Sequence, residues 1–403
     1  MSASRSFDVI VVGGGIAGST LAGVLARSGL GVLVVEREAR FRDRVRGEGT
    51  WPWGVARALR TGLGDLFAQA EVVKVRAMQR YDDQQPVEAN VWAESSIDGV
   101  TEIAFSHTRL QQAAFDWAAA HGATTLRPAK ATRFANGGAP TVTVVQDGQE
   151  VEFTARLVVG ADGKLSGVRR WAGGESIADP EHHRFGGVLV SGTRIDRDCD
   201  NYFWAPGLIV NWFAAGAEQE RLYLSMTEDR LRETGVDRSF EATIELAARY
   251  MPEGALDEVQ QAGPIGYFPN NDIWASSITG NDVVLIGDAA GAPDPTQGHG
   301  TPLLFHDVCE LSELLLADCD WSAATQEFAA RRRRAYEVIR EYDRWSNILH
   351  TEGDEANRFR EGHNRAEQHD PTLGGFALME ARGPDGLRAD EDARRIFFGE
   401  DLP

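Results

Sequence analysis

The chain has 403 residues, 42% of them hydrophobic and 25% charged, which is typical of a globular protein and favours two domains. Its 61 acidic and 41 basic residues give a formal net charge of −20, and this acidity disfavours a nucleic-acid partner, which needs a concentrated basic face. Three scattered cysteines (Cys199, Cys309 and Cys319) predict neither a disulfide framework nor a metal site. Because we find no leader sequence and no apolar run of about 18 residues, we expect a cytoplasmic protein with no membrane span.

The first predicted element is a strand–helix–strand unit over residues 7–36. Between its first strand and its helix, Gly13, Gly15 and Gly18 have G-x-G-x-x-G spacing, and Glu36 ends the second strand. Such glycines permit a tight turn and the close approach of a pyrophosphate to the helix N-terminus, and a carboxylate at the strand end can accept hydrogen bonds from ribose hydroxyls. The unit predicts dinucleotide binding without separating NAD from FAD.

The rest of the chain alternates between helical and strand patterns. Helices are predicted over 55–70 with a break near Gly62–Gly64, over 108–122, over 239–251 and over about 305–317. Strands are predicted within 72–106, 141–163 (a hairpin turning at Asp147-Gly148), 184–227 and 282–288. We interpret the basic run over 330–340 as a solvated helix face, and the polar tail from 350 has weak helical signals.

Two further motifs follow predicted buried strands. GADGKLSGVRR (160–170) places Asp162 directly after a strand, where a simple strand-to-helix turn would also fit. IGDAAGAPDPTQGHG (286–300) is a second glycine-rich loop, containing Gly287 and Asp288. Together with the first glycine motif, these sequences resemble, in order and spacing, the three fingerprints of the para-hydroxybenzoate-hydroxylase-like single-component FAD-dependent monooxygenases, the group A flavoprotein monooxygenases. The resemblance covers roughly residues 7–345.

The resemblance implies an α/β fold with a Rossmann-like FAD-binding domain, an inserted β-sheet-rich substrate domain and a C-terminal helical segment. The boundaries we expect are 1–75, 104–175 and 275–349 for the discontinuous FAD-binding domain, 76–103 and 176–274 for the substrate domain, and 350–403 for the C-terminal tail. The first loop would bind the ADP half of non-covalent FAD, Asp288 would reach the ribityl chain, and backbone N–H groups of the later glycine-rich stretch would lie near the flavin ring.

The candidate cofactor-binding residues are therefore Gly13, Gly15, Gly18, Glu36, Arg46, His107, Asp162, Gly287, Asp288, Gly298, His299, Gly300 and Thr301. Arg46 matches an arginine that the family uses near the cofactor, and Glu48 is expected to form a salt bridge with it. His107 stands where the family often has an arginine or glutamine at a helix start. The sequence departs from the family at Gly291, where histidine is common, and at Pro302, which lacks an N–H group.

In this family NAD(P)H reduces FAD, O₂ adds to give a C4a-hydroperoxide, and one oxygen atom is transferred to an organic substrate. The resemblance thus implies an NADPH- or NADH-dependent hydroxylase or epoxidase, in which the flavin carries the chemistry and no side chain is assigned as catalytic. A flavin-dependent reductase or dehydrogenase, a flavin halogenase and a non-enzymatic FAD-binding module remain as alternatives. We expect a monomer or homodimer.

The inserted strands are expected to form the substrate pocket over the flavin. Asn211 and Phe213 alternate on one face of a predicted strand, Trp212 lies on the other, and no basic residue occurs from 205 to 220. Because a buried carboxylate without a cation is strongly disfavoured, we expect a large, mostly apolar, aromatic or polycyclic substrate that is not a simple carboxylate. The candidate substrate residues are Trp51, Tyr202, Trp204, Asn211, Phe213, Tyr223, Pro295 and Thr296, although core packing would also explain several of the aromatic side chains.

Overall fold

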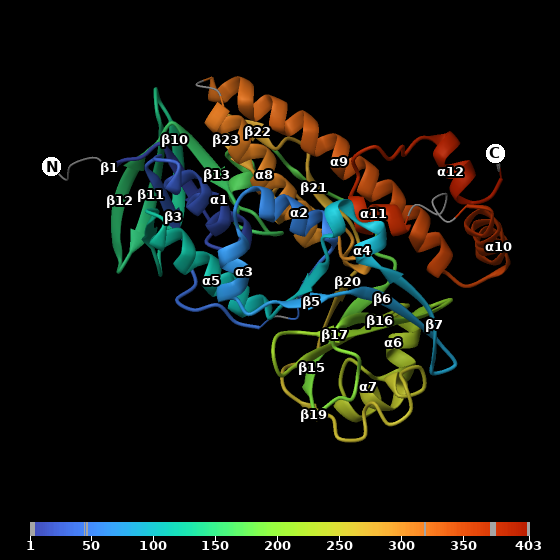
Figure 1. The fold of residues 1–403 in the computed structure, drawn as a ribbon. Coiled ribbons are helices and arrows are strands. Elements are labelled where there is room, and N and C mark those ends of the chain that lie inside the picture. The colour runs from blue at the N-terminus through green and yellow to red at the C-terminus, as the bar shows by residue number, and fades with distance from the viewer. Residues whose placement is uncertain (1–4, 44, 46, 318–319, 371–375, 401–403) are drawn as a thin grey trace.

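The computed structural model describes residues 5–43, 45, 47–317, 320–370 and 376–400. Its centre is a six-stranded sheet, which Figure 1 shows between helices on one side and a smaller sheet on the other. The strands, in spatial order, are β22 (Thr279–Gly280), β23 (Val283–Leu285), β13 (Leu157–Gly160), β2 (Val9–Val12), β3 (Val32–Val35) and β9 (Thr124–Leu126). All neighbours are parallel except β22 and β23. The fold confirms the predicted α/β class.

Both faces of this sheet are buried, which explains why its strands are continuous β-branched runs such as VIVV and VLVV. On one face, Val11 and Val34 pack with three helices, α1 (Ile16–Arg27), α5 (His107–Ala120) and α8 (Gly300–Ala317). On the other face, Ile10 and Leu33 pack against a four-stranded sheet. Its strands are β1 (Arg5–Ser6), β12 (Gln149–Thr154), β11 (Pro140–Gln146) and β10 (Lys130–Asn136). The predicted hairpin at Asp147-Gly148 joins β11 to β12.

The second large sheet forms the lower lobe in Figure 1 and carries α6 (Glu228–Thr234) and α7 (Phe240–Ala247). In spatial order its strands are β19 (Gln260–Gln261), β15 (Arg184–Ser191), β18 (Glu220–Met226), β17 (Leu208–Ala214), β16 (Cys199–Ala205), β6 (Ala77–Asp82) and β7 (Gln85–Val91), and β20 (Gly266–Pro269) also pairs with β15. Trp212 is buried on the face that packs on α7 through Leu246. The predicted division of the chain into domains at particular residues stays a prediction.

Two three-stranded sheets lie between these parts. One consists of β4 (Gly49–Thr50), β8 (Glu102–Ala104) and β5 (Val73–Val75), and the other of β14 (Ser176–Ala178), β21 (Ile273–Ala275) and β24 (Gly291–Ala292). The remaining helices are α2 (Pro52–Arg60), α3 (Gly64–Gln69), α4 (Trp92–Ser95), α9 (Trp321–His350), α10 (Asp354–His369), α11 (Phe376–Arg382) and α12 (Glu391–Phe397). The predicted break near Gly62–Gly64 separates α2 from α3, and α8 begins earlier than predicted.

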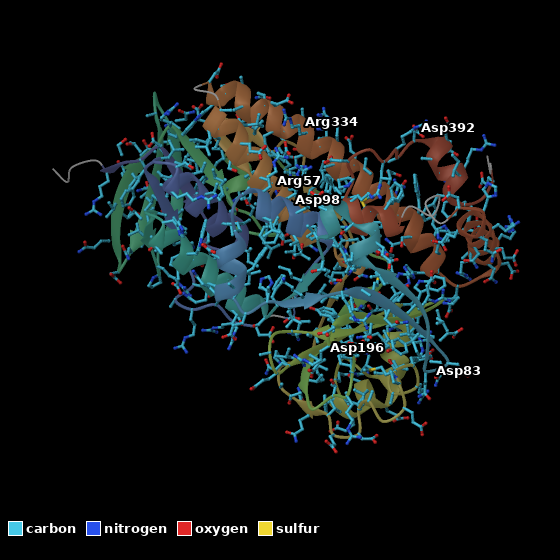
Figure 2. The ribbon with its side chains drawn as sticks, in the orientation of Figure 1. Arg57, Asp83, Asp98, Asp196, Arg334 and Asp392 are labelled. Atoms are coloured by element: carbon cyan, nitrogen blue, oxygen red, sulfur yellow. The ribbon has the colours of Figure 1, made fainter. Side chains whose placement is uncertain are left out.

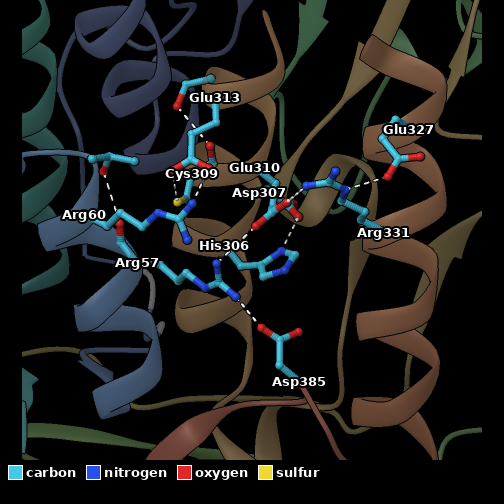
Figure 3. Close-up of polar contacts among 12 residues, drawn as sticks. Arg57, Arg60, His306, Asp307, Cys309, Glu310, Glu313, Glu327, Arg331 and Asp385 are labelled. Carbon is cyan, nitrogen blue, oxygen red and sulfur yellow. Dashed lines mark hydrogen bonds and ion pairs between the residues drawn. The ribbon is translucent and has the colours of Figure 1, made fainter. Parts of the chain in front are cut away.

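The tail beyond residue 350 is more ordered than its polar composition suggests. Phe397 and Phe398 of the α12 end pack in an aromatic cluster with Trp53 and Trp345, so the C-terminal helices are fastened to α2 and α9. Charged side chains add to this attachment, as Figure 3 shows: Arg57 of α2 forms ion pairs with Glu310 of α8, at 3.1 Å, and with Asp385 of the C-terminal segment. Glu310 also accepts a 2.9 Å bond from Arg331 of α9.

The interpretation of the 330–340 run as a solvated face is wrong for Arg332. Arg333 and Arg334 are exposed, and Figure 2 labels Arg334 on α9, whereas Arg332 is only 2% exposed. The helical period places Arg332 on the same side of α9 as Phe328 and Tyr336, which face the interior. In the part of the chain that the structure describes, no helix has both the length and the apolar character needed to cross a bilayer.

Candidate functional site

The three sequence motifs follow the carboxyl ends of three adjacent parallel strands, β2, β13 and β23. They touch one another directly. A Cβ atom on Gly13 of the first motif would lie 2.3 Å from the Ala161 carbonyl oxygen of the second, and one on Gly287 of the third would lie 3.2 Å from the Ala17 Cβ of α1. In open α/β sheets this edge is where ligands bind. Residues far apart in the sequence therefore form one site.

The first loop has the geometry that its glycines predict. Gly13 has φ of +109°, a conformation that favours glycine, and a Cβ on Gly18 would lie 2.0 Å from the Gly13 carbonyl oxygen. Glu36, at the end of β3, accepts a 2.7 Å hydrogen bond from the Gly14 N–H and a 2.7 Å bond from the Glu38 N–H. The carboxylate is thus fixed beside the loop, at the edge where a ribose would lie.

Two helix N-termini face open space at this edge. Gly15 is the N-cap of α1, and Gly300 is the first residue of α8. A Cβ on Gly15 would have only the Gln111 side chain near it, at 3.7 Å, and one on Gly300 would meet nothing within 4 Å. Helix N-termini carry unpaired N–H groups and partial positive charge, so these two positions suit the phosphates of a dinucleotide and an electron-rich ring.

The second motif stabilises its own turn. Asp162 accepts hydrogen bonds from the Ser166 hydroxyl at 2.5 Å and the Gly167 N–H at 2.7 Å. Arg169, 4% exposed, donates to the Ala289 carbonyl at 3.1 Å and so ties this turn to the third motif. A contact between Asp162 and a cofactor stays a prediction. The sequence motif contained Arg169, but its bridging role was not predicted.

The third motif is held from inside by a buried ion pair. Asp307 of α8 accepts a 2.8 Å bond from the Gly287 N–H and a 3.0 Å bond from Arg332 of α9. The Arg332 guanidinium also donates to the carbonyl oxygens of Gly287, at 3.3 Å, and Gly291, at 3.0 Å. Asp288, next in the chain, is half-buried at the strand edge. Neither Asp307 nor Arg332 was predicted as part of the site, because their partners are contributed by other elements.

The turn that follows, Pro295–Gln297, is half-buried, and its N-cap Asp294 and its two polar residues are each bonded to a different part of the chain. Asp294, fully buried, accepts from the Thr296 N–H at 2.8 Å and contacts His182 Nε2 at 2.7 Å. Asn270 donates to the Thr296 hydroxyl at 2.6 Å. The Gln297 side-chain amide donates to Ser346 of α9 at 2.6 Å, and the Gln297 main-chain carbonyl accepts from the Trp51 indole N–H at 2.8 Å. The turn is therefore rigid on its inner side.

The helix after this turn, α8, has one backbone N–H donor fewer in its first turn because residue 302 is proline. Pro302 lies in the first turn of α8, where N–H groups have no partner within the helix, so the proline is tolerated there.

The His299 side chain is 2% exposed and faces Asp343 of α9 at 3.7 Å instead of the cofactor edge. Burial lowers the pKa of His299 to about 3 and raises that of Asp343 well above its ordinary value, so burial favours the uncharged form of both groups.

The predicted substrate residues of the large sheet lie on one face. Tyr202, Asn211 and Tyr223 are directly opposite one another on β16, β17 and β18. Phe213 is on the same face and packs near Tyr223, with ring centroids 5.9 Å apart. Trp212 is on the opposite face, as its alternation predicts. Trp204 also lies on the first face, and its indole N–H donates to His350 of α9.

A basic residue does occupy this face, immediately beyond the range in which the sequence has none. Arg221 lies opposite Phe213 and is fully buried. It donates to Glu48 at 2.5 and 2.8 Å and to Asp43 at 3.2 Å. Glu48 thus pairs with Arg221, while the predicted partner, Arg46, lies outside the described residues. The guanidinium charge is compensated within the protein, so it provides no free cation for a substrate carboxylate.

The segment around Glu48 also approaches two other predicted positions. His107, the first residue of α5, contacts the Gly47 carbonyl at 2.9 Å through Nδ1. A Cβ on Gly47 would lie 3.7 Å from the Thr301 hydroxyl of α8. Trp51, the N-cap of α2, packs edge-on to Trp92 with centroids 5.9 Å apart. The structure therefore brings His107, Thr301 and Trp51 to the region between the two glycine-rich loops and the large sheet.

Residues 6–340 match the family described as an FAD binding domain. The chain belongs to this FAD-binding family. The match spans all three motifs, and it confirms the family and the FAD cofactor that the sequence predicts. The residues present fit that cofactor, because the cradle at Gly13 and Gly18 excludes a side chain and both helix N-termini are open.

Individual relatives of this FAD-binding protein differ in their reactions. It is 27% identical over 304 residues to digeranylgeranylglycerophospholipid reductase 2 of Methanococcoides burtonii, covering 73% of this chain and 71% of the relative. It is 24% identical over 321 residues to squalene epoxidase 3 of Arabidopsis thaliana, covering 76% of this chain but only 60% of the epoxidase. The solved structure of p-nitrophenol 4-monooxygenase PnpA of Pseudomonas putida DLL-E4 has a TM-score of 0.78 at 19% identity, covering 95% of this chain and 100% of PnpA, and confirms the fold.

Replacing Glu36 by alanine is expected to weaken FAD binding by roughly 1–3 kcal/mol, because a charged acceptor at the first loop is lost. The dissociation constant can be measured by titrating apoprotein with FAD and following flavin fluorescence. The variant Glu38→Gln, at a half-buried position two residues further along the chain, is the matched control and is expected to bind normally. Turnover per bound flavin should remain close to that of the wild type. Unchanged affinity in Glu36→Ala would contradict the assignment.

Proposed function

We propose that the protein is an NAD(P)H- and O₂-dependent FAD monooxygenase acting on a largely apolar, aromatic or polycyclic substrate. The observation that carries the proposal is the meeting of two glycine-rich loops, which follow strands β2 and β23 on either side of β13, together with an aromatic face of the large sheet that carries Phe213 and Tyr223. Relatives that include a named epoxidase and a solved monooxygenase of the same fold support it. When bound, FAD supplies the redox chemistry by accepting a hydride from NAD(P)H and activating O₂.

The residues of the chain would hold the cofactor along the sheet edge. Glu36 would accept hydrogen bonds from the adenosine ribose, and the α1 N-terminus at Gly15 would face the pyrophosphate. Asp288 would accept from ribityl hydroxyls. The open N-terminus of α8 at Gly300, with Thr301, would direct N–H groups toward the flavin ring and stabilise negative charge on it. Arg46 and His107 remain candidates for further contacts.

The substrate would lie against the sheet face that carries Tyr202, Asn211 and Phe213. These side chains offer aromatic surface with few polar atoms, which suits an apolar ring system. Because Glu48 already neutralises Arg221, a substrate carboxylate would enter this region without a free counter-ion. Pro295 and Thr296 would form the floor beside the flavin edge. The task of these residues is to orient the substrate and to exclude water.

A flavin-dependent reductase is the second candidate, because a named reductase is among the relatives and covers a similar part of the chain. The two candidates are separated by comparing NAD(P)H oxidation in air and without O₂ across a panel of neutral aromatics, polycyclics, isoprenoids and benzoates. A monooxygenase requires O₂ and incorporates one atom of ¹⁸O₂ into the product, as mass spectrometry detects. Substrate turnover that proceeds equally without O₂ would establish the reductase instead.

Introducing a charge at Phe213 tests the substrate face. Phe213→Arg is expected to weaken productive binding of neutral aromatics at least about tenfold, because the new guanidinium would be desolvated on an apolar surface opposite Arg221. Phe213→Leu is the control for shape and should bind within a few-fold of the wild type. The measurement is the substrate concentration that half-saturates NAD(P)H oxidation, in preparations matched for flavin content. If a small hydroxybenzoate is the best wild-type substrate, the proposed substrate class is wrong.

A further inference from the structure

The inner side of the Pro295–Gln297 turn holds a fully buried carboxylate. Asp294 has no solvent exposure, and it N-caps the turn by accepting the Thr296 N–H bond at 2.8 Å. Its second oxygen contacts His182 Nε2 at 2.7 Å. Burial alone would raise the pKa of Asp294, but the hydrogen bonds from His182 and Thr296 outweigh this effect and hold the pKa below its ordinary value. A negative charge is therefore kept directly beneath the turn.

His182 connects this charge to solvent. Its side chain is 29% exposed and lines a cavity of about 420 Å³, together with His183, Asn271, Asp272 and Trp345. The other side chains that tie down the turn are buried: Asn270 and Ser346 have no exposure, and Trp51 has 8%. His182 is thus the side chain through which protons from the cavity can reach Asp294.

We propose that His182 and Asp294 form a proton-exchanging positioning pair beneath the turn, and that protonation of His182 from the cavity sets the net charge beneath the bound flavin. The inference rests on the proposed function, in which this turn faces the flavin edge. With His182 protonated, the pair carries no net charge; with His182 neutral, it carries one negative charge. Negative charge in a buried position disfavours added electron density on the ring, so deprotonation should make the flavin harder to reduce.

The neighbouring histidines of this pair cannot perform the same function. Burial is the main cause that lowers the pKa of His183 to about 4 and those of His299 and His350 to about 3, so these imidazoles stay neutral above pH 5. Burial raises the pKa of Asp272, on the segment after β20, to about 7, so it exchanges protons within the tested range, but wild type and variants share this group equally.

Other polar groups approach His182 from several elements. On its own segment, His183 Nδ1 lies 2.9 Å from His182 Nδ1, and from α9 the Asn347 amide contacts Nε2 at 3.3 Å. The cavity wall also carries Asp179, Glu341, Arg344 and Arg394. Arg340 pairs with Asp179 at 2.6 Å, and Arg344 pairs with Glu341 at 2.9 Å, so these charges are largely compensated. The pair of His182 and Asp294 is the one in direct contact with the turn.

The test uses the flavin-loaded protein and measures the reduction potential of the bound flavin from pH 5 to 8 by equilibration with a redox dye. His182→Gln keeps a donor toward Asp294 but cannot titrate, Asp294→Asn keeps the Thr296 acceptor but removes the charge, and His121→Gln on the far end of α5 is the control. Over this range, the ratio of oxidised to reduced flavin at fixed dye potential should shift at least about fivefold more in the wild type and the control than in either variant.

The outcomes separate the inference from the proposed function. Wild-type pH dependence in His182→Gln or Asp294→Asn would overturn the role of the pair, while failure of the wild type to bind FAD would overturn the assignment of the site itself. FAD affinity gives a second readout that does not depend on turnover. His182→Ala, which leaves the Asp294 charge unpartnered, should weaken FAD binding more than His182→Gln does, and equal affinities of these two variants would contradict the positioning part of the inference.

Discussion

Replacing Arg332 by methionine is expected to release most of the bound FAD and to lower the free energy of unfolding by about 3–5 kcal/mol. Arg332 is 2% exposed, and its partner Asp307 is fully buried. The substitution leaves the Asp307 charge uncompensated and leaves the Gly287 and Gly291 carbonyl oxygens without their donor. Because those carbonyls belong to the second loop, both stability and cofactor binding should fall.

The Arg332→Met experiment combines urea unfolding with the ratio of flavin to protein absorbance in the purified protein. Arg334→Met removes the same charge from the exposed side of the same helix, and its effect on stability should stay within about 0.5 kcal/mol. A double variant, Arg332→Met with Asp307→Leu, should recover part of the lost stability because no buried charge remains unpaired. Full flavin occupancy in Arg332→Met would show that the ion pair between Arg332 and Asp307 is not needed for FAD binding.

Glu380→Gln is expected to stabilise the protein at alkaline pH by roughly 2–4 kcal/mol and to have little effect at pH 5. Glu380 of α11 is 6% exposed, and burial, with the nearby Asp200 as the next cause, raises its pKa from 4.5 to about 8. Burial likewise raises the pKa of Asp200 to about 7 and that of Glu102 well above its ordinary value. These three carboxyl groups come from α11, β16 and β8.

Stability falls with rising pH because the folded state favours the protonated form of Glu380. The stabilising contribution of Glu380 is fully present below pH 4.5 and is lost as the pH rises through about 8, when the buried group must ionise. A glutamine cannot ionise, so the variant should keep its stability at pH 9. Urea unfolding at pH 5, 7 and 9 measures the difference, with the exposed Glu391→Gln on α12 as control. A pH-independent difference between Glu380→Gln and wild type would refute this account.

The sequence was most informative where function depends on local geometry. Gly13, Gly18 and Glu36 lie within one strand–helix–strand unit, so their spacing alone predicted how the first loop would be arranged. Alternation likewise assigned Phe213 and Trp212 to opposite faces of a strand. Both patterns depend on the repeat of a single element, which a sequence records directly.

The contacts missed by the sequence analysis join residues that are distant along the chain. Glu48 and Arg221 are 173 positions apart, and His182 and Asp294 are 112 positions apart, so no local pattern indicates that they meet. Arg332 is a different case. Its spacing from buried Phe328 and Tyr336 was a readable helical signal, but a run of four arginines suggested a uniformly solvated face.

The adjacency of β2, β13 and β23 also determines when the protein can acquire its cofactor. Chains emerge from the ribosome with the N-terminus first, so the loop at Gly13 is available long before Val283–Leu285 has been synthesised. A nascent chain that has been synthesised only as far as β13 carries the first glycine-rich loop but not the second, so it has only one of the two loops that would hold the cofactor. The second loop must await synthesis of the remaining strands of the large sheet, β15 to β20. Strand β23 must then pair across a long sequence separation, which is a slow step in folding. Flavin capture should therefore be a late event that accompanies completion of the fold, and supply of free FAD should matter most after synthesis has ended.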